Sequence, residues 1–170
     1  IAHRISNVIE DGYIENRILN NFPGTLGLGL ETLRKLHFAS IPTVTQLIEE
    51  EEDGKRHRFE SVLQLMLSYA KFGEIKYGET PLGDERIQMV FGLITDIDRA
   101  LLSKSAKDRL DTVNGILVRC WDTIYEFLEL CKERQKEAEA AGGIEGVADI
   151  LLKALASIAG DSETGKGGAP

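Results

Sequence analysis

The sequence is poor in the residues that build disulfide-linked, metal-stapled or membrane-spanning proteins. It has only two cysteines, one tryptophan and four prolines among its 170 residues. Cys120 and Cys131 form neither a CxxC pair nor a zinc-finger spacing with histidine, which favours a reduced, cytoplasmic protein. No apolar run approaches the roughly 18 residues of a membrane span, and no signal peptide is visible.

Positive charge is also scarce. Twenty basic residues stand against 28 acidic ones, which gives a net charge of −8. This balance argues against a nucleic-acid backbone or an anionic membrane as the main partner. Apolar residues make up 42% and charged residues 28%, as in ordinary globular domains. A chain of this length buries roughly two thirds of its unfolded surface, so it needs no disulfide or metal to fold.

No segment alternates apolar and polar residues as strands do, and no repeat of constant period is present. Apolar residues instead recur at helical spacing. We therefore expect an all-α fold, an irregular bundle of six or seven helices in one domain over 1–160, with a flexible Gly-rich tail or linker over 161–170. The helices are expected at 2–21, 31–38, 44–53, 59–72, from 84 to about 101, from 106 through 131, and 144–158.

Some boundaries carry specific expectations. Thr43 and Gln46 have the spacing of a capping box, and Gly73 is placed to end the helix before it. The glycines between 24 and 29 indicate a flexible turn. In the longest helix, Trp121 is expected to pack between helices, at the centre of the apolar stripe Leu110, Val113, Leu117, Trp121, Ile124, Leu128 and Cys131. Both cysteines fall on or next to this stripe, which favours buried, inert thiols.

Complete catalytic motifs are missing. The sequence has no HExxH, no Glu-x-x-His pair, no dinucleotide fingerprint and no P-loop. His57 lies in a short basic patch, 55–58, that directly follows the acidic run 49–53. We interpret the two runs as a solvated turn in which the opposite charges partly neutralise each other.

The first helix is different. His3, Asn7, Glu10 and Ile14 lie on one helical face, with Asp11 beside them. A carboxylate can bind zinc, and a neighbouring amide or carboxylate can orient a ligand by hydrogen bonding. The helix could supply one or two ligands at most, and an ordinary polar flank remains the alternative.

The start of the chain carries an expectation of its own. Helical periodicity is already present at Ile1, and no good N-cap precedes His3. We therefore expect this chain to be a piece of a longer polypeptide. The alternative is an intact protein whose first few residues were removed.

The pattern Asn7-x-x-Glu10-Asp11-Gly-x-Ile14-Glu15 resembles a known helix. It is similar to one in bacterial proteins that join a zinc-metallopeptidase-like region to a von Willebrand factor A-like domain. Relatives of the cobalt-chelatase large subunit carry a similar helix. The resemblance covers about 15 of the 170 residues.

By this resemblance, Glu10 would be a zinc ligand, Asn7 and Asp11 would support it by hydrogen bonding, and His3 would lie at the rim. Tyr13 departs from the pattern, because the relatives often have arginine there. The missing HExxH would have to lie upstream in a longer parent protein. Zinc is therefore expected only in that parent, and the isolated chain should bind none tightly, because one carboxylate cannot replace a three-ligand site.

Three hypotheses follow. The first is a helical segment of a metallopeptidase-like parent, with Glu10 as a zinc ligand but no catalysis by this chain alone. The second is a non-catalytic module that binds a protein partner, or flanking domains of its parent, with the acidic run 49–53 and the charged segment 132–139 as candidate surfaces. The third is an effector-like domain whose acidic face recognises a cationic partner.

Overall fold

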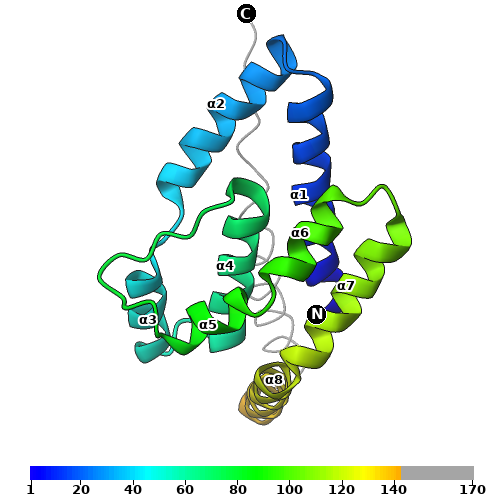
Figure 1. Ribbon diagram of the computed structural model, residues 1–170. Helices are drawn as coiled ribbons and strands as arrows, with labels where there is room; N and C mark the ends of the chain where they lie inside the picture. Colours follow the sequence, from blue (N-terminus) through cyan, green and yellow to red (C-terminus); the bar gives the residue numbers. More distant parts are fainter. Residues whose placement is uncertain (143–170) are drawn as a thin grey trace, which may run out of the picture. The chain divides into compact units, whose positions relative to one another are not determined.

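The computed structural model describes residues 1–142 (Figure 1). These residues form eight α-helices and no strand, so the all-α class is confirmed, although six or seven helices were expected. The helices are α1 (Ala2–Asn21), α2 (Thr25–Ser40), α3 (Val44–Glu52), α4 (Arg58–Phe72), α5 (Glu85–Phe91), α6 (Ile94–Leu102), α7 (Ala106–Arg119) and α8 (Trp121–Gly142). The expected helix over 144–158 and the tail over 161–170 lie outside the described residues.

The chain divides into two compact units, Ile1–Phe127 and Leu128–Pro170. The packing described below belongs to the first unit. In the second, residues 131–137 of α8 are exposed, as their polar sequence predicts. None of the helices in the described part of the chain combines the length and apolarity that crossing a membrane requires.

The core of the first unit is built around α1, which packs against α2, α4, α6 and α7. Its inward face is apolar and fully buried at Ile5 and Ile9, as the helical spacing of these residues predicts. Gly12 lets α1 approach α4 closely. A Cβ at this position would lie 2.8 Å from the carbonyl oxygen of Ala70.

The expected boundaries of α3 and α4 are confirmed. Thr43 and Gln46 form the capping box of α3, with the Thr43 side chain accepting from the Gln46 amide at 3.2 Å. Gly73 ends α4 in the left-handed conformation, at φ 72°. The apolar side of α4 supplies much of the core, including the fully buried Phe59 and Met66.

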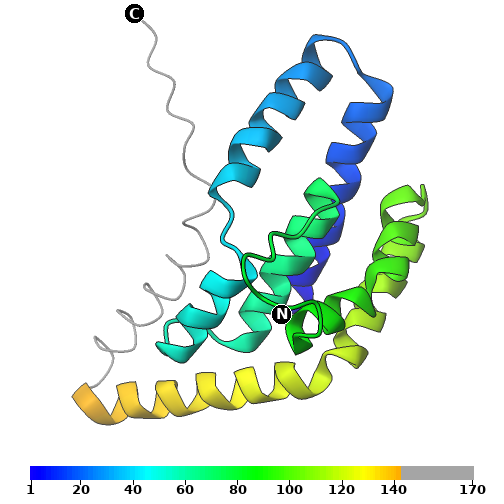
Figure 2. The ribbon, with the colours of Figure 1, turned by 60° about the vertical axis from the view of Figure 1, so that its left-hand side comes forward.

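The predicted start of α2 was wrong. The glycines do not form a turn up to residue 29, because the helix already begins at Thr25. Only Pro23 and Gly24 make the turn, and Gly27 is buried inside the helix, where its amide donates to the Phe22 carbonyl at 2.9 Å. Figures 1 and 2 both show α2 running beside α1 in the opposite direction.

The helix expected from residue 84 is two helices. α5 ends at Phe91, and α6 begins at Ile94 after Gly92 and Leu93. Leu93 takes a core position with 1% exposure, whereas Phe91 is 37% exposed. The break therefore places Leu93 in the core and leaves Phe91 partly exposed.

The longest expected helix is also two helices, α7 and α8, joined at Cys120. α7 begins at residue 106 as expected, and Ser105 caps it, with its hydroxyl accepting from the Asp108 amide at 3.3 Å. The expected core position of Trp121 was wrong, because its side chain is 53% exposed. Of the predicted stripe, Val113 and Ile124 are buried.

Polar residues take the inward positions on α7 instead. Arg109 and Thr112 are buried there, each with a hydrogen-bond partner in another segment. Polar side chains that form hydrogen bonds can be buried at little cost. The buried positions of α7 are therefore shifted by one residue towards the N-terminus, relative to the stripe predicted from apolar spacing.

The two cysteines differ. Cys120 is buried, as expected, and burial raises the pKa of its thiol. Cys131 is exposed, so the expectation of a buried thiol was wrong there. It lies on α8 beyond Phe127, in a stretch whose neighbours at 132–137 are polar and exposed.

Candidate functional site

The proposed zinc ligand, Glu10, is held by an arginine. Its Oε1 accepts a hydrogen bond from Arg109 Nε at 2.7 Å, which connects α1 to α7. The Arg109 guanidinium also lies 3.9 Å from the centroid of the Tyr13 ring and donates to the Ser103 carbonyl at 3.2 Å. Arg109 is 8% exposed, so Glu10 supplies the counter-charge of a buried cation.

The other carboxylates of the motif also form ion pairs between helices. Glu15 lies 3.2 Å from Lys71 Nζ on α4 and 3.8 Å from Arg34 Nε on α2. Asp11 lies 3.8 Å from the same Lys71 Nζ. The motif on α1 therefore ties together the helices that surround it.

The remaining motif residues face water. His3, Asn7 and Ile14 are exposed on α1. Within residues 1–142, no group of three or more histidine, cysteine, aspartate or glutamate side chains is placed to hold a metal ion. The described residues therefore do not by themselves fit a zinc site, and zinc would have to compete with the Arg109 guanidinium for Glu10. Zinc binding by Glu10 in a longer parent stays a prediction.

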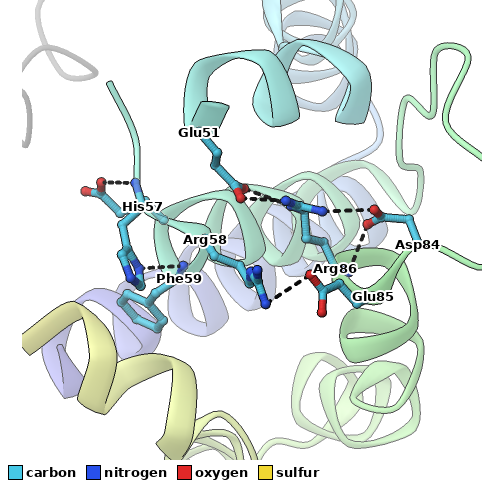
Figure 3. A network of polar contacts seen from close by, with 8 residues as sticks. Glu51, His57, Arg58, Phe59, Asp84, Glu85 and Arg86 are labelled. Carbon is cyan, nitrogen blue, oxygen red and sulfur yellow. Dashed lines mark hydrogen bonds and ion pairs between the residues drawn. The ribbon is translucent and has the colours of Figure 1, made fainter. Parts of the chain in front are cut away.

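The acidic run and the basic patch pair with each other, as expected, at two places. Arg56 Nε contacts Glu50 at 2.6 Å, and Lys55 Nζ contacts Asp53 at 2.6 Å. Glu51 has a different partner, Arg86 at the start of α5, which was not predicted (Figure 3).

Arg86 bridges two acidic residues. It donates to Glu51 through Nε at 2.8 Å and Nη2 at 2.6 Å, and to Asp84 through Nη1 at 2.9 Å. Burial acts to raise the pKa of Glu51, but the hydrogen bonds and positive charge of Arg86 act against it, and this pKa lies below its usual value. The network fastens the end of α3 to the start of α5, and the positive charge of Arg86 is fully compensated within it.

His57 in the basic patch has a structural role. Its Nδ1 accepts from the Phe59 amide at 3.1 Å, so the imidazole caps α4 (Figure 3). Glu60 completes the capping box by accepting from the His57 amide at 3.3 Å. Burial lowers the pKa of His57 and so keeps Nδ1 free of a proton, as this bond requires. The ring also packs 5.3 Å from that of Phe127.

An exposed apolar surface was not predicted. Leu26, Leu33 and Leu36 on α2 are 58%, 64% and 66% exposed. Their spacing of seven and three residues places them on one side of the helix, with Gly29 and Leu30 between them. We call these five residues, Leu26, Gly29, Leu30, Leu33 and Leu36, the α2 leucine face.

The opposite side of α2 holds it to α1 and α4. Gly27 is buried there, and Phe38 packs 5.2 Å from the ring of Phe72. The Arg34 guanidinium lies 5.6 Å from the Phe72 ring centroid and 3.8 Å from Glu15. The leucine face is therefore exposed because α2 is anchored through other residues. Both ribbon views show no other helix of the first unit along the outer side of α2 (Figures 1 and 2).

A groove lies between α2 and the helices that carry it. It has a volume of about 510 Å³, and its lining includes Leu19, Leu28, Phe38 and Phe72. Its Arg34 is already engaged by Glu15, and its Lys35 by Glu31 at 2.8 Å. Leu28 is 63% exposed but lies outside the leucine face.

The junction of α7 and α8 exposes further large side chains. Val118, Trp121 and Tyr125 are 75%, 53% and 52% exposed. These positions lie on either side of the break at Cys120, so they do not share one straight helix face. The α2 leucine face is the longer exposed apolar surface on a single helix of the first unit.

Comparison of this chain with protein-family models gives no match, and neither the curated proteins nor the solved structures give a significant one.

Proposed function

We propose that this chain is a non-catalytic helical module that binds protein through the α2 leucine face. Three leucines spaced along the outer side of α2 are 58–66% exposed. This observation carries the proposal. Burying an exposed leucine side chain gains about 1–2 kcal/mol at this degree of exposure. A partner that covers all three gains about 3–6 kcal/mol from them. Because association itself costs at least about 4 kcal/mol, contacts with residues around the leucines must add to this gain.

The neighbouring surfaces support this choice. The acidic run 49–53 was a candidate contact surface, but Glu50, Glu51 and Asp53 already pair with basic residues of the same chain. A cationic partner would have to displace those residues. An apolar face requires no such exchange.

Photo-crosslinking tests the proposal in the longest natural form of the chain. A photoreactive phenylalanine analogue replaces Leu33, and in a matched control it replaces Leu28. Both leucines are about equally exposed, at 64% and 63%, and both are on α2. We expect a discrete protein adduct from position 33 and little or none from position 28. Equal crosslinking from both positions, or none from either, would overturn the proposal.

A further inference from the structure

The α2 leucine face has the spacing of a coiled-coil seam. Leu26, Gly29, Leu33 and Leu36, followed by Ser40, are separated by three, four, three and four residues. This is the alternation of a and d positions, which lets one helix pack along another with side chains inserted between those of its partner. A single partner helix could therefore pack along the whole length of this exposed surface.

The seam is also symmetric about its centre. When a second α2 is laid alongside in the opposite direction, centred at Glu31, position 26 faces 36 and position 29 faces 33. Each leucine of the seam then meets an apolar residue of the other helix. A two-fold contact of this kind uses the same surface patch on both partners.

Gly29 completes the fit. A Cβ built on Gly29 meets nothing within 4 Å in the first unit, so the chain's own packing does not require glycine there. In the antiparallel pairing, Leu33 of one helix lies opposite Gly29 of the other. A large side chain facing a small one fills the space between two closely packed helices.

Charge favours a second copy at this surface more than elsewhere. The whole chain carries a net charge of −8, so two copies repel each other. α2 has only one acidic residue, Glu31, against Arg34 and Lys35. Glu31 pairs with Lys35 at 2.8 Å, and Arg34 lies against Glu15. The leucine face itself is uncharged. Thr25 and Thr32 lie along one edge of it, and His37 lies along the other.

We propose that the partner of the α2 leucine face is the same face of a second copy, with the two α2 helices antiparallel and Leu33 of each packed over Gly29 of the other. This inference rests on the proposed function and names its partner. A 16-residue helix is about 24 Å long. Such a contact falls at the small end of specific interfaces, below about 1,200 Å² in total, and therefore gives a reversible dimer.

The first test measures self-association of the 170-residue chain by sedimentation velocity over a range of concentrations. Leu33→Glu places a carboxylate in the seam, and the matched control Leu28→Glu adds the same charge outside it. We expect Leu33→Glu to weaken dimerisation at least tenfold and Leu28→Glu to change it less than threefold. Equal effects of the two variants, or a monomeric wild type at all concentrations, would overturn the inference.

The second test distinguishes specific packing along the seam from non-specific hydrophobic association. Gly29→Leu adds an apolar side chain at an exposed position, where an added Cβ meets nothing within 4 Å. Non-specific hydrophobic association predicts stronger self-association, whereas the proposed packing predicts weaker dimerisation because the space for Leu33 is filled. Stronger self-association of Gly29→Leu would contradict the proposed pairing.

The third test fixes the register. Leu26→Glu and Leu36→Lys should each weaken dimerisation, because a charge then faces a leucine at both ends of the seam. When the two variants are mixed, Glu faces Lys at one end and leucine faces leucine at the other. We expect the mixture to form the heterodimer more tightly than either variant dimerises alone. No preference for the heterodimer would exclude this register.

The two proposals fail in different ways. If the crosslink from position 33 joins the chain to a different protein, the interaction function stands and the second copy is excluded. If it joins two copies of this chain, both proposals are supported.

Discussion

Glu10 and Arg109 lie 99 residues apart in the sequence and form a 2.7 Å hydrogen-bonded ion pair between α1 and α7. The resemblance of the first helix to metallopeptidase-like proteins had singled out Glu10 as a metal ligand. In the structure, its carboxylate balances the charge of a buried arginine that also stacks on Tyr13. Glu10 therefore has a structural role that can be tested by mutation.

Replacing Glu10 with glutamine should destabilise the chain by about 1–2 kcal/mol. The variant removes the counter-charge of Arg109, and the cost stays modest because the Glu10 side chain is 39% exposed. Urea unfolding measures the change. The control is Asp11→Asn, whose ion pair with Lys71 is long, at 3.8 Å, and which should cost less than 0.5 kcal/mol. Equal costs for the two variants would contradict the assigned role of Glu10.

Zinc analysis addresses the competing prediction for Glu10. Elemental analysis of the longest expressible parent, and of this chain, is done with and without Glu10→Gln. Zinc that is present in the parent and falls in the variant would support metal binding by Glu10. Zinc content that is the same in both parent proteins would count against it.

Gly12→Ala should destabilise the first unit by about 1–3 kcal/mol, because the new methyl group would lie 2.8 Å from the Ala70 carbonyl oxygen and force α1 and α4 apart. Gly115→Ala in α7 is the matched control. A Cβ there meets nothing within 4 Å, so this variant should gain up to about 1 kcal/mol in helix propensity. Thermal unfolding compares the two. A neutral Gly12→Ala would mean that the helices are less closely packed than described.

Trp121→Ala should cost less than about 1 kcal/mol, because its side chain is 53% exposed. Phe59→Ala, at a fully buried position of α4, should cost about 3–5 kcal/mol. Chemical denaturation measures both. A large loss of stability in Trp121→Ala would instead support the buried position predicted from the apolar stripe.

Stability should fall in mild acid because of His57. Its pKa is lowered by burial from an ordinary value of 6.5, so the unfolded chain takes up a proton more readily than the folded one. The stabilisation is complete above pH 6.5 and is lost as the pH falls through the lower pKa of the folded state. Asparagine also caps helices but does not titrate, so His57→Asn should lose less stability between pH 7.5 and pH 5.5. Identical losses in urea unfolding would contradict the role of His57.

Local features of the fold could be predicted from the sequence because they depend on neighbouring residues. The limits of α1, the capping box of Thr43 and Gln46, and the left-handed Gly73 follow from short-range hydrogen bonding and backbone sterics. The all-α class follows from apolar spacing. These properties hold whichever helices later pack together.

Other features were decided only by tertiary contacts. The side of α7 that faces inward depends on partners for Arg109 and Thr112 that come from α1 and α6. Gly27 remains helical because α2 is anchored to α1 and α4, which leaves the leucine face exposed. Spacing shows which residues share a face of a helix, but burial depends on what the rest of the chain places against it.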